Sequence, residues 1–362
     1  MNGLKVPVIT PPESDEIEVS LFGPGYGECA VLHIGEGEWI IVDSFRDPDT
    51  NEPVALKYLE QLGIDPCSAI CCVIATHWDD DHIDGLADLI RASPNASFAI
   101  SGAFSNVEFK SLLRGWLAFD SVFLGSGVNQ LNEIIALKGT PILASENTVV
   151  YERHTGLQCE VRALSPSNDG IVATVTRLAS FENPTHGKRL PRIEGNHSSV
   201  VISVEIAGRS ILLGGDLEVR SSRLYGWRRV VDSHQKSGRA KHEVFKIPHH
   251  GSVNGDADEI WKGLLEKHPH SVVSPFVGGR VKLPGGQERH RIRGRTPNAF
   301  LTAPPAAKKF RHKNRTVEKT MWEAAKRIEA VPNRFGQVRL RSKISEPVGT
   351  WDVKLFGASE PV

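Results

Sequence analysis

The chain has 362 residues, with 43 Lys and Arg against 43 Asp and Glu, so its formal net charge is zero. Hydrophobic residues make up 40% of the sequence and charged residues 24%. This ordinary globular balance excludes a disordered or fibrous protein, and the neutral total excludes a uniformly basic coat for nucleic acid.

The number of cysteines and the length of the apolar runs predict the cellular compartment of the protein. The five cysteines are odd in number and form no repeated CxxC pairs, which favours a reduced environment over a disulfide framework. No stretch approaches the roughly 20 apolar residues of a transmembrane helix. The first residues also lack the apolar core of a signal peptide. We therefore expect a cytoplasmic protein with no membrane partner.

The first half of the chain alternates apolar strands with polar loops and helices. The runs of strand length are residues 17–21, 29–34, 39–43 and 69–75, followed by several short strands between 140 and 180. Helical patterns cover residues 53–62, 85–93, 104–118 and 126–138. The last long strand delivers the chain directly into the polar segment THWDDDHIDG, residues 76–85.

The second half repeats this order. Residues 199–213 predict a hairpin that turns at Ala207-Gly208 and ends at GGD, 214–216. A helix expected over 217–232 precedes the strand 244–247, which ends on PHHGS. A further helix at about 316–329 and two strands close the chain. Strands that feed polar loops followed by helices predict an α/β fold of two packed sheets flanked by helices, with a site at one edge.

The strongest chemical signal is the segment HWDDDH, residues 77–82, at the end of a buried strand. Alternate side chains of an extended backbone share a face, so His77, Asp79 and Asp81 can point the same way. His82 joins them from the start of the next helix. Carboxylates packed this closely repel one another unless a cation compensates them. We therefore interpret the segment as a metal site in preference to a solvated acidic turn.

Three further strand ends carry possible ligands. His197 precedes one strand, Asp216 closes another, and His249 and His250 follow a third. Each alone has a structural explanation, because a histidine at a strand end is often simply hydrogen-bonded and Asp216 could cap a helix. Together with residues 77–82 they supply the imidazoles, carboxylates and bridging aspartate that a two-metal site needs.

The order H-x-D-x-D-H, His, Asp, His resembles the metallo-β-lactamase superfamily, and within it the hydrolase domain of ComEC-type competence proteins. The matching motifs are a Gly-rich turn GPGYGE (23–28), HWDDDH (77–82), NHSS (196–199), GGD (214–216) and HHGS (249–252). The resemblance implies a four-layer αββα sandwich in which two mixed β-sheets are flanked by helices. It also implies one hydrolase domain over residues 1–362 with a core at about 17–345. This chain departs from the ComEC pattern because it carries no membrane channel and has an Arg-rich segment.

The ligands implied by the resemblance fall into two subsites that share Asp216 as a bridge. One subsite comprises His77, Asp79 and His197. The other comprises Asp81, His82 and His250. Asp43, at the end of an early strand, is expected to support a ligand. Catalysis is assigned to Asp81 and His249. Three roles are open for His249, which could support a ligand, contact a phosphate or protonate the leaving group.

Asp79 stands where H-x-H-x-D-H members have a second histidine, and it makes the site harder and more negative. Oxygen ligands favour Mn²⁺ or Mg²⁺, while Zn²⁺ is also compatible with the histidines. We expect two divalent ions, Mn²⁺ or Zn²⁺ first and Mg²⁺ as an alternative. Two such ions about 3.5–4 Å apart activate a bridging water and neutralise phosphoryl oxygens.

Residues 278–319 contain twelve Lys and Arg against two Glu, which leaves the rest of the chain negative by ten charges. The segment is rich in Gly and Pro and shows little apolar periodicity. It is either a solvated face or flexible tail, or a phosphate-binding flap or strand beside the metal site. We assign substrate contacts to this basic insertion, about 278–315, and to the HHGS motif. The assigned residues are Ser252, Arg280, Lys282, Arg289, Arg291 and Arg293.

The sequence thus predicts a metal-dependent hydrolase, and more specifically a nuclease or phosphodiesterase that cleaves DNA or another nucleic acid. Two alternatives stay open. One is a hydrolase of a small ester, lactone or thioester, and the other is a catalytically degenerate metal-binding interaction module. Added salt separates the two enzymes, because it weakens polyanion cleavage steeply and affects neutral substrates hardly at all.

Overall fold

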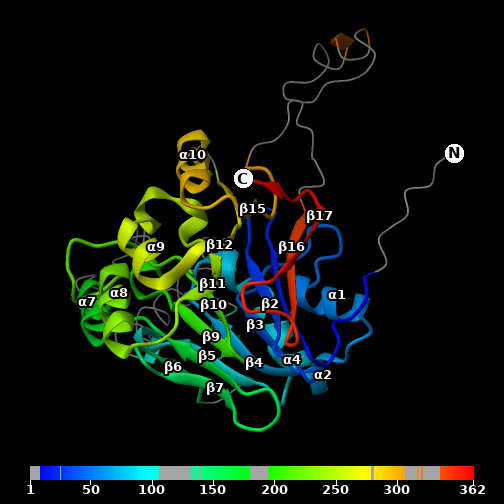
Figure 1. The fold of residues 1–362 in the computed structure, drawn as a ribbon, viewed down its shortest axis with the longest axis horizontal. Coiled ribbons are helices and arrows are strands. Elements are labelled where there is room, and N and C mark those ends of the chain that lie inside the picture. The colour runs from blue at the N-terminus through cyan, green and yellow to red at the C-terminus, as the bar shows by residue number, and fades with distance from the viewer. Residues whose placement is uncertain are drawn as a thin grey trace, which may run out of the picture.

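Two eight-stranded sheets form the centre of the fold, and the first combines N-terminal strands with two strands from the C-terminal end (Figure 1). Its strand order is β17-β16-β1-β2-β3-β4-β5-β6. The bounds are β1 Glu16–Phe22, β2 Cys29–His33, β3 Trp39–Val42, β4 Ile70–Ala75, β5 Ser97–Ser101, β6 Ile142–Ala144, β16 Gly336–Lys343 and β17 Asp352–Gly357. Strands β1 to β3 pair antiparallel and β3 to β6 pair parallel, so the sheet is mixed.

The second sheet has the order β18-β15-β12-β11-β10-β9-β8-β7. The bounds are β7 Val149–Arg153, β8 Cys159–Ala163, β9 Ile202–Ile206, β10 Arg209–Leu213, β11 His242–Lys246, β12 Leu265–Val273, β15 Ala299–Leu301 and β18 Glu360–Pro361. Strands β10, β11, β12 and β15 run parallel, whereas β9 and β10 form the predicted hairpin around Ala207-Gly208. A separate hairpin joins β13 (Phe276–Gly278) to β14 (Val281–Leu283).

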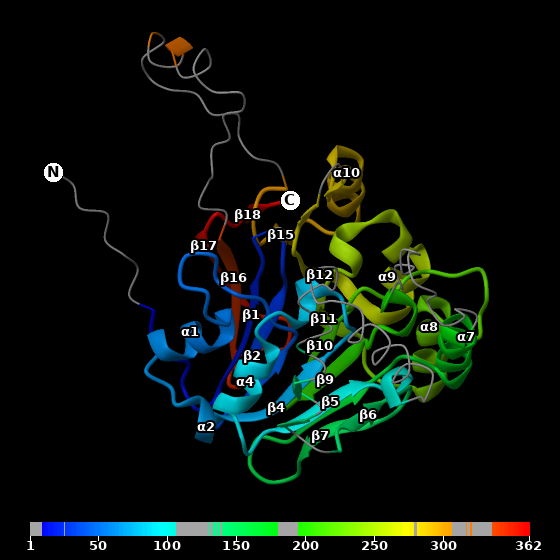
Figure 2. The same ribbon diagram turned by 180° about the vertical axis from the view of Figure 1, so that it is seen from behind.

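Helices cover the outer faces of both sheets (Figures 1 and 2). On the first sheet lie α1 (Val54–Gln61) and α4 (Leu86–Ala92), with the short α2 (Pro66–Ala69) and α3 (Asp80–Ile83) nearby. On the side of the second sheet lie α7 (Asn168–Ala179), α8 (Trp227–Ser237), α9 (Asp258–Leu264) and α10 (Gly286–Arg295). Short 3₁₀ segments are Gly102–Ser105, Gly195–Ser198, His249–Gly251 and Val253–Gly255.

Three separate apolar cores hold these layers together. In β3, Trp39 and Ile41 point outward onto α1 and α4, while Ile40 and Val42 point inward between the sheets. Leu212 and Phe245 of the second sheet pack outward against α8 and α9. Successive side chains of a strand face opposite sides, so strands buried on both faces read as continuous apolar runs. The three cores confirm the predicted αββα sandwich.

The structure is a computed structural model that describes residues 9–24, 26–105, 140–179, 195–278, 281–305 and 335–362, with 130, 133–134, 136–137, 316 and 319–320. The helices predicted at 104–118, 126–138 and 316–329 fall largely outside these residues, as does Arg280. Among the described helices, none combines the length and the apolar character that crossing a bilayer requires.

Two segments differ from the sequence prediction. The helix expected over 217–232 begins only at Trp227, after a loop that ends on Gly226 with a positive φ of 73°. Within the aperiodic basic segment, residues 286–295 form α10, in which Ile292 is the buried residue. Ion pairs hold α10 in place, as described below, and such docking leaves no apolar period in the sequence.

Candidate metal centre

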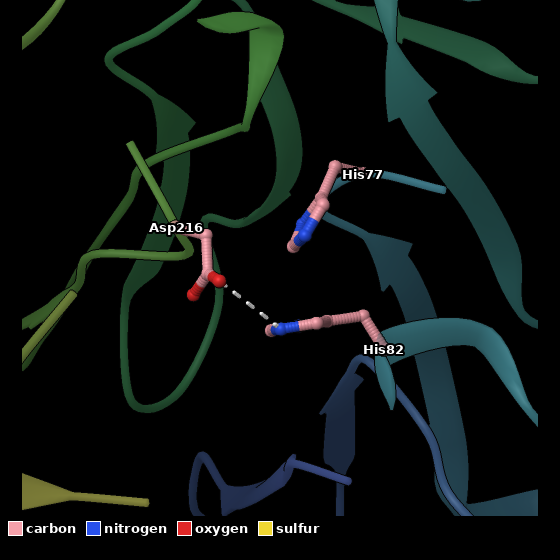
Figure 3. A group of neighbouring side chains, drawn as sticks. All are labelled: His77, His82 and Asp216. Atoms are coloured by element: carbon pink, nitrogen blue, oxygen red, sulfur yellow. Dashed lines mark ion pairs between the residues drawn. The ribbon is translucent and has the colours of Figure 1, made fainter. Parts of the chain in front are cut away.

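Loops at one edge of the two sheets bring the candidate ligands together. Residues 77–82 follow β4 of the first sheet, whereas Asp216 follows β10 and His250 follows β11 of the second. In Figure 3, His77 and His82 point from one side toward Asp216 on the other. The centre therefore lies where both sheets present strand ends.

Three overlapping groups of side chains could hold a metal ion in the described part of the chain. They are His77 with His82 and Asp216, then Asp81 with His82 and His250, and then Glu28 with Asp43 and His82. Within each group the ligand atoms lie within 4.8 Å of one another. His82 belongs to all three groups, so the groups form one continuous centre.

Asp216 faces imidazoles from both sheets. Its Oδ2 lies 3.6 Å from Nε2 of His82 and 3.4 Å from Nε2 of His250. Asp81 Oδ2 lies 3.3 Å from the same His250 nitrogen and 3.9 Å from His82 Nε2. Four ligand atoms thus converge on a small space, which is the arrangement that a divalent cation requires.

Two ring nitrogens test whether these residues fit a metal. The rings of His77 and His82 are fully buried, but the Nε2 atom of each ring has no hydrogen-bond partner. Buried polar atoms are normally satisfied, and leaving one unpaired costs roughly 1–3 kcal/mol. A metal ion would satisfy both atoms, so the donor set fits the group.

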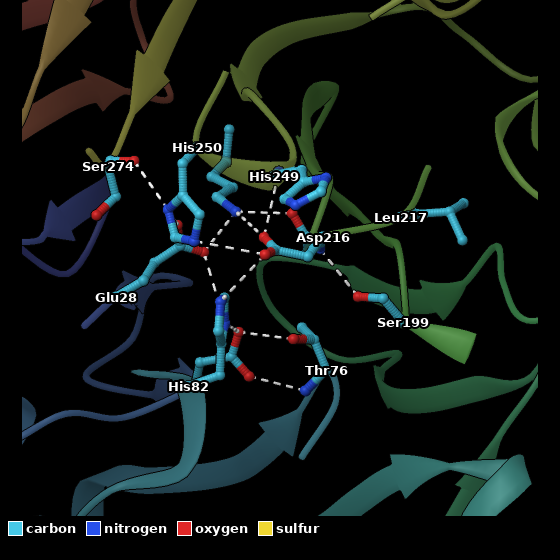
Figure 4. A network of polar contacts seen from close by, with 12 residues as sticks. Glu28, Thr76, His82, Ser199, Asp216, Leu217, His249, His250 and Ser274 are labelled. Carbon is cyan, nitrogen blue, oxygen red and sulfur yellow. Dashed lines mark hydrogen bonds and ion pairs between the residues drawn. The ribbon is translucent and has the colours of Figure 1, made fainter. Parts of the chain in front are cut away.

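Asp43 fixes the orientation of His82, the residue that lies near Thr76 in Figure 4. Its Oδ2 lies 2.8 Å from Nδ1 of His82, and it accepts hydrogen bonds from the backbone N–H and hydroxyl of Thr76. With Nδ1 occupied, Nε2 of His82 is the nitrogen that faces Asp216. Metal-bound histidines commonly use a carboxylate contact of this kind.

The electrostatics of the centre follow from burial and crowding. Burial lowers the pKa of His77 to about 3, with a further contribution from His82, so this ring is neutral and ready to bind a metal. Burial raises the pKa of Asp81, but His82 and His250 outweigh it and hold that pKa below its usual range. Burial lowers the pKa of His82, but the carboxylates of Asp216, Asp43 and Asp81 outweigh burial and raise this pKa well above its usual value.

The His249-His250 pair has an unusual backbone. Both residues have positive φ, 49° and 51°, a conformation that side chains other than glycine adopt at a cost of about 1–2 kcal/mol. This backbone aims the His250 ring at Asp81 and Asp216, while its Nδ1 lies 3.1 Å from the carbonyl oxygen of Ser274. Phe276 of β13 packs on the same ring at 5.2 Å between centroids.

His249 belongs to a second polar cluster beside the centre. Its Nδ1 lies 3.5 Å from Oε1 of Glu218, and its Nε2 lies 3.2 Å from the side-chain amide of Asn196. The backbone N–H of His249 donates to Asp216 Oδ1 at 3.2 Å. The cluster is therefore connected directly to the candidate ligand Asp216.

Two predicted ligands lie outside the three groups. The His197 ring contacts Arg177 and Arg220 and lies 3.9 Å from Glu218, so it sits in the second cluster. Asp79 Oδ2 lies 3.8 Å from His77 Nε2 but joins none of the groups. Their roles as ligands stay predictions.

Sequence reasoning missed two buried charges in the centre. Glu28, from the Gly-rich turn, and Lys246, the last residue of β11, pair at 2.5 Å between Oε1 and Nζ. Lys246 stands inside the apolar run VFKI, which predicts only a strand. The signal that could have found it is a lysine at the end of a strand with both faces buried, since such a charge needs an acidic partner.

Most residues predicted to bind substrate make contacts within the protein. Arg289 pairs with Glu360 at 3.2 Å, and Arg291 pairs with Asp256 at 2.6 Å and donates to the carbonyl of Gly251. Arg293 donates to the carbonyl oxygen of Val362, and the Ser252 hydroxyl accepts from the backbone N–H of Asn254. Lys282 is exposed on β14, in the hairpin that carries Phe276.

Several solved structures resemble the chain. The metallo-β-lactamase fold protein YhfI from Bacillus subtilis has 11% identity and a TM-score of 0.39, with 79% of this chain and 95% of that chain covered. A HARLDQ-motif mutant metallo-β-lactamase from Cronobacter sakazakii has 17% identity and a TM-score of 0.35, covering 63% and 75%. MEM-A1, a subclass B3 enzyme from a soil metagenome library, has 13% identity and a TM-score of 0.34, covering 67% and 81%. No curated protein matches the chain at a significant level.

The sequence profile of the metallo-beta-lactamase superfamily matches residues 22–260, which is well over half of the chain. The matched range contains every residue of the three metal-binding groups. Proteins of this fold are generally metal-dependent hydrolases. The chain therefore belongs to the metallo-β-lactamase superfamily.

Proposed function

We propose that the protein is a metal-dependent phosphodiesterase that cleaves nucleic acid, like the hydrolase domain of ComEC-type competence proteins. The observation that carries the proposal is the donor set, in which the carboxylates of Asp81 and Asp216 lie 3.3–3.9 Å from the Nε2 atoms of His82 and His250. A centre this rich in carboxylate favours hard cations, which suit phosphoryl oxygens.

The residues that would hold two divalent cations are His77, Asp81, His82, Asp216 and His250. We expect Mn²⁺ or Zn²⁺, with Mg²⁺ as the harder alternative. Bound cations would supply a Lewis acid for a phosphoryl group and lower the pKa of a water. The chain itself buries His77, His82, Asp216 and His250 and leaves Asp81 partly exposed, and Asp43 keeps His82 turned toward Asp216.

Groups around the centre suit a negatively charged substrate. The exposed Lys282 lies on β14, paired with β13, whose Phe276 packs on His250. Arg220 and His197 lie beside Glu218, which in turn approaches His249. His249 is one residue from a ligand and is exposed enough to reach a substrate, so it remains our candidate for a phosphate contact or for protonating the leaving group.

A second candidate function rests on a different observation. The arginines of α10 form ion pairs and hydrogen bonds inside the protein, so they offer less positive surface than their sequence suggests. This favours a small substrate, namely an ester, lactone or thioester, over an extended polyanion.

The test is an activity screen with Mn²⁺ and Zn²⁺ in turn. Purified protein is incubated with single- and double-stranded DNA, RNA, a cyclic dinucleotide and chromogenic esters. Nucleic-acid cleavage should disappear in Asp81→Ala and persist in Asp80→Ala. The Asp80 variant is a matched control because it removes the same charge from an exposed position of the same loop.

Salt separates the two candidates. Cleavage of a polyanion should weaken steeply between roughly 50 and 200 mM salt, because phosphate contacts release counterions. Hydrolysis of a neutral ester should hardly change. A protein that binds metal but leaves every phosphodiester intact would contradict the nuclease proposal.

A further inference from the structure

A lysine is buried inside the candidate metal centre. Lys246 ends β11 and is 2% exposed. Its Nζ lies 2.5 Å from Glu28 Oε1 and 3.6 Å from Asp216 Oδ1, and it donates to the carbonyl of Gly215 at 2.8 Å. Two carboxylates, those of Glu28 and Asp216, therefore face this ammonium group. The centre thus contains a cation of its own.

The two oxygens of Asp216 have different surroundings. Oδ1 accepts from the backbone N–H of His249 at 3.2 Å and lies 3.6 Å from Lys246 Nζ. Oδ2 faces Nε2 of His82 at 3.6 Å and Nε2 of His250 at 3.4 Å. Rotation of the carboxylate would take Oδ1 away from both of its partners. The contacts to Oδ1 therefore decide which oxygen points toward the metal-binding side.

Glu28 holds the lysine in this position. Its backbone N–H donates to the carbonyl of Asp81 at 2.9 Å, which ties the Gly-rich turn to the metal-binding loop. Its Oε1 takes the closer contact with Lys246, while Asp216 takes the longer one. Lys246 is thus shared between two carboxylates and does not neutralise Asp216 alone.

We propose that Lys246, anchored by Glu28, is a positioning residue that holds Asp216 Oδ1 and leaves Oδ2 as the metal-facing oxygen. The inference rests on the metal centre of the proposed function. It assigns Glu28 and Lys246 a part in metal binding. Without it, the two residues would only be a buried ion pair that neutralises itself. Groups that orient metal ligands in this way typically contribute 10- to 100-fold to affinity.

The experiment separates positioning from simple charge pairing by comparing Lys246→Met with the double variant Glu28→Gln, Lys246→Met. Melting temperature is measured on the metal-free proteins, and affinity for Mn²⁺ and for Zn²⁺ alone is measured by calorimetric titration. Lys246→Met leaves Glu28 buried without its cation, so its melting temperature should fall. The double variant removes both charges and should recover most of that loss.

Metal affinity should behave differently from stability. We expect dissociation constants roughly 10- to 100-fold higher in both variants, because both lose the Lys246 contact to Asp216 Oδ1 and keep only the hydrogen bond from the His249 backbone. Lys241→Met, at the exposed position just before β11, should match the wild type. Wild-type affinity in the double variant would overturn the positioning role, and this variant decides the question even where the single one fails to fold.

Asp216→Ala distinguishes failure of this inference from failure of the metal centre. It should abolish tight binding of at least one ion. If the wild type binds neither metal, or if Asp216→Ala binds both as the wild type does, the proposed centre itself is wrong. If only the Lys246 variants bind normally, the centre stands and the positioning role is wrong.

Discussion

The metal centre and helix α10 both looked like functional regions in the sequence, but the fold treats their polar groups in opposite ways. In the centre, His77 and His82 keep buried ring nitrogens without a partner. In α10, Arg289, Arg291 and Arg293 each contact a group of the protein. A fold that leaves buried polar atoms unpaired bears an energetic cost, which a ligand can offset. Arginines that already pair with groups of the protein give no such indication that a ligand is missing.

Removal of metal is the strongest way to test this contrast. Chelation should reduce hydrolysis by about 1000-fold or more, because a metal contributes several kcal/mol to stabilising the transition state. It should also lower the melting temperature, since an ion at 100 times its dissociation constant adds about 2.7 kcal/mol of stability. Activity assays and thermal scans before and after re-addition of Mn²⁺ measure both. Full activity in the chelated protein would remove the basis for the centre.

Helix α10 should respond in stability, irrespective of metal. Arg291→Ala breaks the ion pair with the half-buried Asp256 and the hydrogen bond to Gly251, and we expect a loss of about 1–3 kcal/mol in the free energy of unfolding. Denaturant titrations with and without metal should give the same loss. If stability is unchanged while DNA binding weakens, then α10 is a substrate surface after all.

A buried histidine outside the centre extends the comparison. His242 has partners on both ring nitrogens, Ser203 at 2.8 Å and the Leu264 carbonyl at 2.9 Å, and burial lowers its pKa to about 4. The unfolded chain takes up a proton below its ordinary pKa near 6.5, whereas the folded protein does so only near 4. Stability should therefore fall as the pH drops through this window, by about 2 kcal/mol at pH 5.

The variant His242→Gln isolates this effect. Unfolding free energies of the variant and the wild type are compared at pH 7.5 and pH 5, with metal-free protein at both values. The wild type should lose its advantage over the variant as the pH falls. An equal acid-induced loss in the two proteins would show that His242 is not the group responsible.

The smallest effect concerns the salt dependence of nucleic-acid binding. Lys282→Ala should reduce the slope of log affinity against log salt by about one, because it removes one exposed cation from the hairpin that carries Phe276. Arg295→Ala is the matched control, since Arg295 pairs with Asp256 and Asp258. Equal changes in both slopes would mean that ion-paired arginines also contact the substrate.

The sandwich could be predicted because strands such as β3 and β4 are apolar on both faces and lead into polar loops. The strand before residues 77–82 and the hairpin at Ala207-Gly208 follow this pattern directly. Helix α10 could not be predicted from periodicity, since charged contacts hold it and Ile292 is its buried residue. The late start of α8 was missed because residues 217–226 contain a loop that carries Glu218 and Arg220 beside the site.

The site was only partly visible in the sequence for a related reason. Ligand types at strand ends point to the centre, but partner choice depends on three-dimensional contacts. Nothing in the sequence distinguishes His250, which faces Asp81, from His197, which contacts Arg220. Glu28 and Lys246 are 218 positions apart in the numbering, and only the packing of the two sheets brings them together.

The candidate ligands come from both sheets, which has a consequence for the kinetics of unfolding. His77, Asp81 and His82 follow β4 of the first sheet, while Asp216 and His250 follow strands of the second. An ion held by both sets would cross-link the two sheets reversibly. With such an ion bound, separation of the sheets would require coordinate bonds to break, so slow metal dissociation would lengthen the lifetime of the folded state and raise its resistance to proteolysis.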